Sequence, residues 1–365
     1  MNGDARLFAM VSGGGTGGHV YPPIALAQEL VRRGHPRESI RLVGVRGRLE
    51  ERAWPAAGFA VDLLPGRGLR RRMTLENVGV ALDAVRAFLA ARRLVRRFRP
   101  RVVVGFGGYG SLPAVAAART LRVPTLVHEQ DAAPGLANRI AVRLGSRAAV
   151  SLPDTPLARA TRTGNPVRTE MAELVRSPSS PPLLAVVGGS LGARTLNDTS
   201  LELYGRWRHR VDVAVHHVTG PRNFDECARR LASERQAGDT LDYVMVPYEE
   251  RLDGVYARAS LALCRAGAGT VAELAAAGVP SVLVPLPGAP ADHQTRNAET
   301  LARAGAAVMV PDDECDGARV DELVSPLLHD RARLDVMSTA ARALARPDAA
   351  ARLADLVEEV AGVRA

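Results

Sequence analysis

Two glycine-rich turns are the parts of this sequence best suited to chemistry. The first runs from Gly13 to His19 and the second from Gly188 to Ala193. Each turn follows an apolar, strand-like run and opens a helix-like segment. Turns of this kind bring backbone N–H groups and a helix N-terminus to a phosphate. The sequence therefore predicts two nucleotide-binding-type halves, with a phosphorylated ligand in one half or in a cleft between them.

Two side chains beside such turns could take part in a reaction. His19 ends the first turn, where the helix dipole keeps an imidazole neutral, as a general base requires. A structural hydrogen bond that caps the helix explains the same residue equally well. Glu273 lies four residues after Gly269, at the start of another predicted helix. Its carboxylate can accept from both hydroxyls of a ribose, although a glutamate in a first helical turn can also merely offset the dipole.

Two common nucleotide chemistries are disfavoured. Gly13, Gly15 and Gly18 match the dinucleotide pattern G-x-G-x-x-G, but that fingerprint also needs an acidic residue after the second strand. This chain has Gly44-Val45-Arg46 there. A phosphate-binding loop of the Walker type needs a lysine, and the sequence contains none.

The elements that must position these residues alternate between strand and helix. The helix after the first turn is expected to carry Pro22 and Pro23 in its first turn and to stop at Gly34. The predicted strands are Leu7–Ser12, Ile40–Val43, Ala60–Leu64, Val102–Phe106, Thr125–His128 and Leu183–Val187. Such alternation predicts an α/β protein with parallel sheets covered by helices on both faces.

The length of 365 residues exceeds what a single core usually organises. The alternating pattern pauses at 164–168 and again at 177–182, which predicts the connection between two domains. The second half repeats the order of the first: a glycine turn at 107–111 and another at 267–270 each lead through an alanine-rich helix to an apolar strand. Two doubly wound, Rossmann-like domains are therefore expected, with ligand sites at the carboxyl ends of their strands.

The charges and cysteines of the sequence indicate the surroundings and partners of the protein. The net charge is +9, and every basic residue besides histidine is arginine. Arginines alternate with apolar residues from Arg67 to Arg101, as suits a surface lying on anionic lipid headgroups; a core-facing helix with a solvated basic face would give the same pattern. Three scattered cysteines indicate neither a disulfide framework nor a zinc site. No export signal is expected, and 4% aromatic residues argue against nucleic-acid binding.

Seven segments together resemble the MurG family, in the same order and over nearly the whole chain. Enzymes of this family transfer N-acetylglucosamine from UDP-N-acetylglucosamine to lipid I, the undecaprenyl-diphospho-muramoylpentapeptide of peptidoglycan synthesis, and form lipid II. The segments that carry the resemblance are Gly14–His19, Gly107–Tyr109, His128–Gln130, Gly164–Arg168, Gly188–Ser190, Arg265–Glu273 and Asp292–Ala298.

The resemblance implies a glycosyltransferase-B fold. Residues 1–164, with a C-terminal helix at about 346–365 that crosses back, would bind acceptor and membrane, and residues 165–345 would bind UDP-N-acetylglucosamine. It also implies inverting transfer without a metal or other cofactor, which agrees with the lack of an Asp-x-Asp pair in the sequence. The implied location is peripheral, on the cytoplasmic face of the cell membrane. Beyond its two substrates, the implied partners are the anionic membrane surface and proteins of cell-wall synthesis and division.

The resemblance also implies roles for individual residues. His19 would remove the proton from the 4-hydroxyl of the muramyl sugar, with His128 and Glu129 as further candidates for this catalytic role. The implied acceptor positions are Gly15, Gly107, Gly108 and Tyr109. The implied donor positions are Thr16, Gly17, Gly18, Asp131, Arg168, Ser190, Tyr248, Gly267, Ala268, Gly269, Thr270, Glu273 and Gln294.

Some positions depart from the family pattern. Asp131 stands where the family commonly has asparagine, and a carboxylate lacks the amide's donors and repels a diphosphate unless an arginine pairs with it. Leu191 replaces a common glutamine. These changes leave room for a related transferase that acts on a secondary metabolite. A UDP-N-acetylglucosamine 2-epimerase or a non-catalytic nucleotide-sugar sensor would also fit the two-domain pattern.

Overall fold

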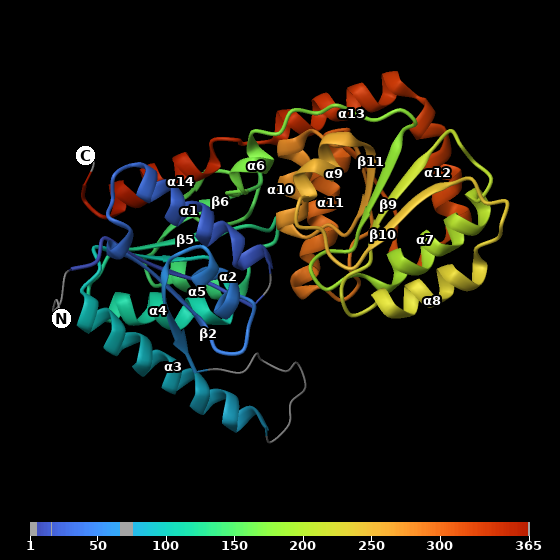
Figure 1. Cartoon of the computed structure of the whole chain (residues 1–365). Helices are drawn as coiled ribbons and strands as arrows, with labels where there is room; N and C mark the ends of the chain where they lie inside the picture. Colours follow the sequence, from blue (N-terminus) through green and yellow to red (C-terminus); the bar gives the residue numbers. More distant parts are fainter. Residues whose placement is uncertain (1–5, 16, 66–75, 364–365) are drawn as a thin grey trace. The chain divides into compact units, whose positions relative to one another are not determined.

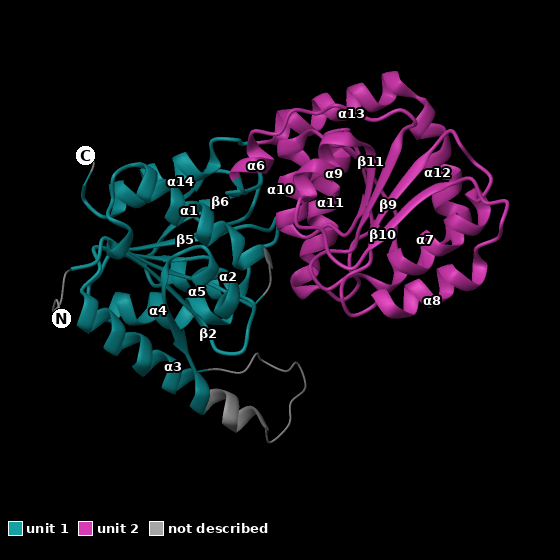
Figure 2. Cartoon of the chain, in the orientation of Figure 1, with its two compact units in different colours: residues 1–168, 346–365 teal, residues 169–345 magenta. Residues whose placement is uncertain are grey.

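A computed structural model describes residues 6–15, 17–65 and 76–363. The chain divides into two compact units (Figure 2). Unit 1 contains residues 1–168 and 346–365, and unit 2 contains residues 169–345. The sequence places the first domain boundary at 164/165, whereas the structural division falls at 168/169, so that Arg168 is the last residue of unit 1 before the chain enters unit 2.

Unit 1 is built on a parallel sheet of seven strands in the order β3-β2-β1-β4-β5-β6-β7. Its strands β2, β5 and β6 are labelled in Figure 1. The strand order reverses between β1 and β4, and the loops that follow these two strands therefore lie side by side at the carboxyl edge. The strands are β1 (Ala9–Ser12), β2 (Ile40–Val45), β3 (Ala60–Leu64), β4 (Val102–Gly105), β5 (Thr125–Glu129), β6 (Arg147–Val150) and β7 (Ala160–Arg162).

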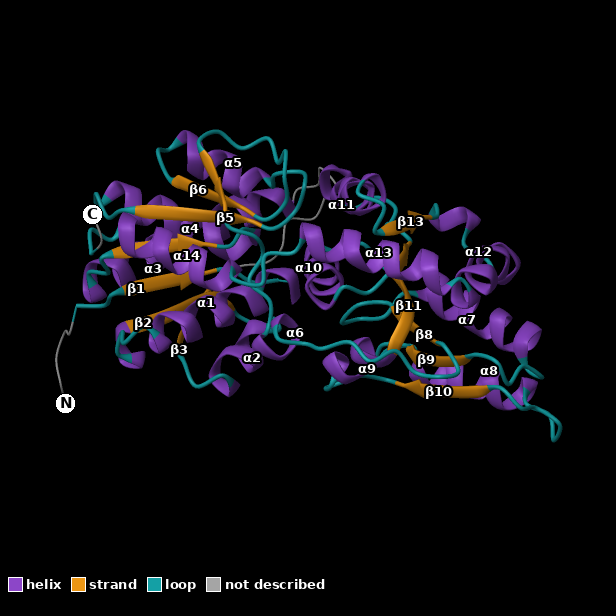
Figure 3. Ribbon diagram, turned by 90° about the horizontal axis from the view of Figure 1, so that it is seen from above, coloured by secondary structure: helices purple, strands orange, loops and turns teal. Residues whose placement is uncertain are grey.

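Helices flank the strands of unit 1 on both sides (Figure 3). One core joins β1, β2 and β4 to α1 and α14, and it includes the fully buried Trp54. The other core joins the opposite face to α3, α4 and α5. The helices are α1 (Tyr21–Arg32), α2 (Glu50–Ala56), α3 (Glu76–Phe98), α4 (Gly108–Thr120), α5 (Leu136–Arg143) and α14 (Ala349–Val360), with a short 3-10 turn η1 at Gly17–His19 and another, η2, at Arg37–Ser39.

The C-terminal helix α14 belongs to unit 1, although 177 residues of unit 2 precede it in the chain. Arg33, at the end of α1, donates to Asp355 at 2.7 Å and to Glu358 at 3.0 Å. Burial opposes the charged form, but the hydrogen bond to Glu29 and the contacts with these two carboxylates together raise the pKa of Arg33. The ion pairs add to the apolar packing of α14 on α1 and fix the returning helix.

Unit 2 repeats the arrangement with a parallel sheet of six strands in the order β10-β9-β8-β11-β12-β13. Its order reverses between β8 and β11. The strands are β8 (Leu183–Val187), β9 (Ala214–Val218), β10 (Asp242–Val246), β11 (Ala259–Cys264), β12 (Ser281–Leu283) and β13 (Ala307–Met309).

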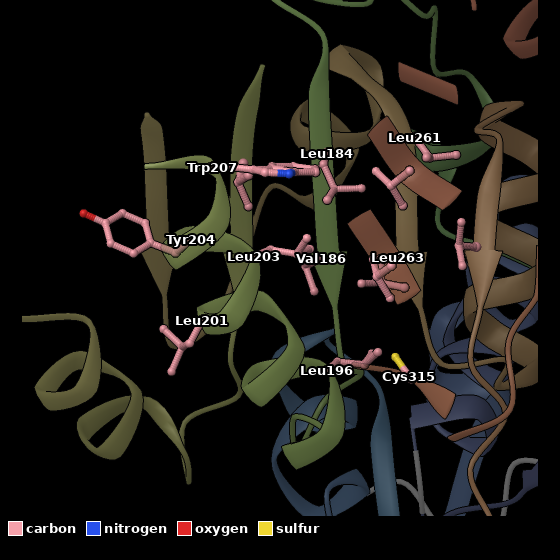
Figure 4. Close-up of a cluster of buried hydrophobic side chains, with 14 of the residues drawn as sticks. Leu184, Val186, Leu196, Leu201, Leu203, Tyr204, Trp207, Leu261, Leu263 and Cys315 are labelled. Carbon is pink, nitrogen blue, oxygen red and sulfur yellow. The ribbon is translucent and has the colours of Figure 1, made fainter. Parts of the chain in front are cut away.

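The core of unit 2 joins β8 and β11 to the helices on one face, with Tyr204 and Trp207 of α7 among its largest buried side chains (Figure 4). Near this core, Trp207 Nε1 donates to Asp321 in α12 at 2.8 Å. The helices are α6 (Thr169–Ala172), α7 (Arg194–Trp207), α8 (Phe224–Glu234), α9 (Leu252–Arg258), α10 (Ala268–Ala277), α11 (His293–Arg303), α12 (Gly317–His329) and α13 (Arg331–Leu344), with 3-10 turns η3 (Pro290–Asp292) and η4 (Asp312–Glu314).

The fold class predicted from the sequence, two doubly wound α/β domains, is confirmed. The predicted strands Ala60–Leu64 and Leu183–Val187 agree with β3 and β8 residue for residue. The helix α1 has proline at its first positions, and Gly34 follows its end with φ +95°. The sequence did not single out β6 and β7, which extend the outer edge of the first sheet.

Candidate active site

The glycine turns lie where the strand order of each sheet reverses. In unit 1, the turn at Gly13–Gly15 follows β1 and the turn at Gly107–Tyr109 follows β4. In unit 2, the turn at Gly188–Ser190 follows β8, and Gly267 precedes α10 after β11. Crevices outside the carboxyl ends of the strands at such points are where ligands bind in open α/β sheets. The topology thus gathers the predicted residues into two groups, one in each unit.

The two turns of unit 1 pack against each other through their backbones. A Cβ atom added to Gly108 would lie 2.6 Å from the carbonyl oxygen of Gly14, and one added to Gly110 would lie 2.5 Å from that of Gly13. Gly108 also has φ +72°, which disfavours any side chain. These glycines are therefore required by the fold itself.

His19 lies beside the second of these turns. A Cβ atom at Gly107 would be 3.2 Å from His19 Nε2 and 3.4 Å from Asn138 Nδ2. The imidazole is thus next to the Gly107 backbone, and it is half-buried. Gly17 and Gly18 form the 3-10 turn that ends at His19. Thr16 lies outside the described residues.

Glu50, which sequence reasoning missed, braces the first turn. Its carboxylate is fully buried and accepts from Gly15 N and from Val45 N, both at 3.1 Å. The backbone N–H of Gly15 is one that the sequence would assign to a phosphate, but here an internal carboxylate accepts it. The only sequence signal was a pair of adjacent glutamates, Glu50 and Glu51, after the second strand, and Glu50 is 35 residues from the turn that it supports.

His128 is enclosed by the protein. Its side chain is fully buried, its Nε2 lies 2.8 Å from the Gly164 carbonyl oxygen, and its Nδ1 lies 3.1 Å from Gln130 Nε2. A carbonyl can only accept and an amide nitrogen can only donate, so Nε2 carries the proton and Nδ1 accepts. Burial lowers the pKa of His128 to about 4, and His19 contributes in the same direction. Both ring nitrogens are occupied, which disfavours the expectation that His128 acts as the base.

The carboxylate of Glu129 is also bonded to groups of the protein. Its carboxylate accepts from Gly135 N at 2.8 Å, Asn138 Nδ2 at 2.9 Å and Asp131 N at 3.2 Å. Burial raises the pKa of Glu129, against the opposing effect of these hydrogen bonds. The carboxylate thereby shapes the loop from Asp131 to the start of α5, and the structure favours a positioning role over a catalytic one.

Two further predicted residues of unit 1 lie near the ends of α1 and α4. The guanidinium carbon of Arg168 lies 6.0 Å from the centre of the Tyr21 ring, at the start of α1. Tyr109 is half-buried in the first turn of α4. Burial raises the pKa of Tyr109, and the charge of Asp83 in α3 adds to the effect.

In unit 2, two glycines at the start of α10 have free space where a side chain would lie. A Cβ atom at Gly267 or at Gly269 would meet no other atom of the described chain within 4 Å, and neither glycine has a positive φ. The fold therefore does not require glycine at these two positions. Thr270 and Glu273 follow on the same helix, and both are half-buried, whereas Ala268 is buried. The first N–H groups of a helix bind anions.

Gln294 connects the loops around this helix start. Its Oε1 accepts from Ala266 N at 3.2 Å and from Leu286 N at 3.0 Å, which leaves its amide nitrogen as the group able to donate to a ligand. Arg265, which sequence reasoning did not assign a separate role, is buried, donates to the carbonyl oxygens of Val284 and Pro285, and pairs with Asp312. These hydrogen bonds hold the loops that follow β11 and β12 in place.

Two predicted donor residues are exposed on neighbouring loops of unit 2. Ser190 is exposed in the turn after β8, beside Gly189, where an added Cβ would meet no described atom. Tyr248 is 51% exposed after β10. The next residue, Glu249, pairs with His216 of β9 at 3.1 Å, which ties the Tyr248 loop to the sheet.

The surface of α3 bears apolar and basic side chains together. Leu82, Val85 and Leu89 are exposed and lie on one helical face, with Arg86 and Arg93 also exposed. Residues 67–75 of the predicted basic stretch lie outside the described residues. No helix in the described ranges is long and apolar enough to cross a membrane.

Comparisons with known proteins connect these features to a reaction. The glycosyltransferase family 28 N-terminal domain matches residues 9–150, and the glycosyltransferase family 28 C-terminal domain matches residues 183–353. A relative from Desulforudis audaxviator is 38% identical, covering 97% of this chain and 98% of its own length. A relative from Stutzerimonas stutzeri is 39% identical over 96% and 98%. Both are named UDP-N-acetylglucosamine–N-acetylmuramyl-(pentapeptide) pyrophosphoryl-undecaprenol N-acetylglucosamine transferase.

Solved structures agree with the sequence relatives. MurG of Acinetobacter baumannii superposes with a TM-score of 0.78 at 28% identity, covering 97% of this chain and 100% of that protein. A UDP-N-acetylglucosamine 2-epimerase has a TM-score of 0.69 at 15% identity, over 99% of this chain and 98% of that one. A calicheamicin glycosyltransferase has a TM-score of 0.67 at 20% identity, over 98% and 99%. At such identities the last two show only that the fold is shared.

Proposed function

Since the chain belongs to the MurG family of glycosyltransferases, we propose that it transfers N-acetylglucosamine from UDP-N-acetylglucosamine to lipid I and forms lipid II. The bond that breaks joins the anomeric carbon of the sugar to the diphosphate. The bond that forms joins that carbon to the 4-oxygen of the muramyl sugar, whose proton passes to a base. The glycosyltransferase-B fold, shared with the MurG structure, supplies the two units for this reaction.

The free space beside Gly267 and Gly269, at the start of α10, is the observation that carries the proposal. Gly267 and Gly269 have no packing neighbour that requires them, so we assign their bare backbone to the donor diphosphate. The aligned peptide dipoles of the ten-residue helix favour negative charge at this end. Glu273 then accepts from the ribose hydroxyls, Gln294 donates to a sugar hydroxyl, and Ser190 and Tyr248 complete the donor set.

Within unit 1, we assign the base to His19. It is the histidine of the first turn, it is half-buried, and it is the one of the two candidate histidines that is not enclosed. His128 and Glu129 are positioning residues in this scheme, because their polar atoms bond to Gly164, Gln130 and the 131–138 loop. We assign Gly15, Gly107, Gly108 and Tyr109 to the acceptor surface. Thr16, Gly17, Gly18 and Asp131 remain assigned to UDP-N-acetylglucosamine.

Transfer with inversion and without a metal also forms part of the proposal. Direct displacement by the muramyl oxygen inverts the anomeric carbon. The departing UDP carries negative charge, which helix N–H groups and the Arg168 guanidinium can stabilise. The sequence contains no Asp-x-Asp pair for a divalent ion.

We further propose peripheral binding to the cytoplasmic face of the membrane, where the polyprenyl tail of lipid I is held. Leu82, Val85 and Leu89 would enter the headgroup region while the neighbouring arginines meet anionic lipids. Liposome co-sedimentation tests this: more protein should be recovered on anionic than on neutral vesicles, and less at high salt. Equal recovery under all conditions would contradict it. Contacts with cell-wall synthesis and division proteins remain part of the proposal.

The direct test is transfer of radiolabelled N-acetylglucosamine to a short-chain lipid I analogue in the presence of EDTA. The wild-type protein should transfer, and His19→Ala should lower the rate by about a hundredfold or more. Formation of UDP-N-acetylmannosamine without any acceptor would indicate the 2-epimerase instead. Binding of the donor without transfer to lipid I would indicate a different acceptor or a sensor.

A further inference from the structure

Helix α2 bonds to both ends of the segment 15–20, which contains His19 and is called the His19 segment below. Glu50, the first residue of α2, accepts from Gly15 N at 3.1 Å. Trp54, one helical turn later, donates from Nε1 to the carbonyl oxygen of Val20 at 2.9 Å. Gly15 lies four residues before His19, and Val20 directly follows it. We propose that Glu50 and Trp54 form a clamp that positions His19 for the proton transfer, an inference that rests on the proposed function.

The chain makes room for the Glu50 carboxylate at two glycines. A Cβ atom at Gly14 would lie 2.0 Å from Glu50 Oε1, and one at Gly44 would lie 2.6 Å from Glu50 Cγ. Gly44 is the residue where the dinucleotide pattern loses its acidic group. The carboxylate that the pattern lacks at the strand end is thus present six residues later, directed inward at the turn and not outward at a ligand.

Both members of the clamp are fixed. Glu50 and Trp54 are each fully buried, and the second oxygen of Glu50 accepts from Val45 N at 3.1 Å. The carboxylate therefore connects the end of β2 to the turn after β1. Trp54 belongs to the apolar core formed with α1 and α14. The His19 segment is held by a rigid helix, which is how precise placement of a reacting group is achieved.

Glu50→Gln tests the clamp with the smallest change of shape. Glutamine has one acceptor where glutamate has two, so one of the two backbone N–H groups loses its partner. We expect kcat for transfer to lipid I to fall by about 10- to 100-fold. The KM for UDP-N-acetylglucosamine should stay within about twofold, because the donor diphosphate is assigned to unit 2.

Glu29→Gln is the matched control. Glu29 is a buried glutamate of the same unit, and its carboxylate pairs with Arg32 and Arg33, away from the glycine turns. The substitution makes the same change of charge and should leave kcat within about twofold of wild type. Unaltered kcat in Glu50→Gln, or an equal loss in both variants, would overturn the proposal.

A double-mutant cycle separates positioning of His19 from a general effect on folding. If Glu50 acts through His19, then Glu50→Gln should cause no further loss of kcat in a protein that already carries His19→Ala. If Glu50→Gln lowers kcat by the same factor with and without His19→Ala, then Glu50 acts independently of His19, and the clamp is overturned. If the wild-type protein fails to transfer at all, the proposed function fails, and the cycle is not reached.

Trp54→Phe keeps the proposal testable if Glu50→Gln does not fold. Phenylalanine retains most of the buried ring but loses the Nε1 donor to Val20. We expect a loss of kcat of about three- to tenfold with an unchanged donor KM. A kcat equal to that of wild type, in a folded Trp54→Phe protein, would overturn the role of the second contact. In the His19→Ala background this loss should also disappear.

Discussion

The turn after β4 in unit 1 and the turn after β11 in unit 2, which precedes α10, occupy corresponding places in their sheets, yet glycine serves a different purpose in each. In unit 1, Gly108 and Gly110 are pressed against the carbonyl oxygens of Gly14 and Gly13. In unit 2, Gly267 and Gly269 face open space. A glycine that the fold requires has a structural reason of its own, whereas Gly267 and Gly269 have none within the described chain. This difference supports our proposals that the anion site lies in unit 2 and that the turns of unit 1 support a reacting side chain.

Hydrogen bonds show a second difference between the two units. In unit 1 they involve the turn after β1, which packs against the turn after β4. Gly15 N already donates to the buried Glu50 carboxylate. A negative group at that place competes with a phosphate for the same N–H. In unit 2, Gln294 and Arg265 bond to groups on the loops around the start of α10, at Ala266, Leu286 and Val284. The glycine patterns alone predicted a phosphorylated ligand without deciding which turn binds it, and these hydrogen bonds distinguish the two units.

The largest effect that would sharpen this comparison is expected from Gly108→Ala. The new Cβ would lie 2.6 Å from Gly14 O, at a φ of +72°. The left-handed backbone and the overlap together should lower the free energy of unfolding by about 2–5 kcal/mol. Urea unfolding measures the loss, and UDP binding by calorimetry should survive wherever unit 2 remains folded. A stable Gly108→Ala protein would contradict the scaffolding role of this turn.

The second prediction is a loss of folding stability at low pH, which should be about equally large in both units. Each unit holds a fully buried histidine with both nitrogens bonded: His128 in unit 1, and His217 in unit 2 between Tyr243 OH at 2.8 Å and Asn197 Oδ1 at 2.9 Å. Burial lowers the pKa of His128 from 6.5 to about 4 and that of His217 to about 3. The unfolded chain then binds more protons below pH 6.5, so stability decreases as the pH falls from 6.5 through these values.

Urea unfolding at neutral pH and near pH 4 measures this acid effect. Between neutral pH and pH 4 each histidine should contribute a loss of about 3 kcal/mol, and His128→Gln and His217→Gln should each flatten the pH dependence. A dependence unchanged by either substitution would show that other groups dominate. A flattening in only one variant would break the parallel between the units.

The sequence predicted the fold class and the positions of the glycine turns because both depend on local patterns. Apolar runs and glycine spacing mark strands and the turns that follow them, as at Leu183–Val187. The contacts within the site depend on residues distant in the chain. Glu50 reaches Gly15 across 35 residues, and no periodicity in the sequence marks it as a partner of the turn.

The sequence also could not predict whether a side chain at the end of a strand faces a ligand or is enclosed by the protein. His128 and Glu129 end β5, next to each other, and adjacent residues of a strand normally face opposite sides. Both are nevertheless enclosed, because Gly164 covers the histidine and the loop at Asp131–Asn138 folds over the glutamate. Sequence reasoning could name these residues but could not distinguish a base from a support, since that depends on the folded loop.

The smallest expected effect, and the most direct test of the comparison, comes from Gly269→Ala. The same substitution that damages unit 1 at Gly108 should here be neutral or stabilising by about 0.5 kcal/mol, because alanine suits a helix better than glycine and the new methyl meets no described atom. The methyl would, however, occupy the space that we assign to the diphosphate. UDP affinity by calorimetry should therefore fall by about tenfold, which corresponds to about 1.4 kcal/mol. Gly269→Ala with unchanged UDP affinity would mean that the open space at α10 is not the anion site, and the distinction between the two turns would then lose its functional meaning.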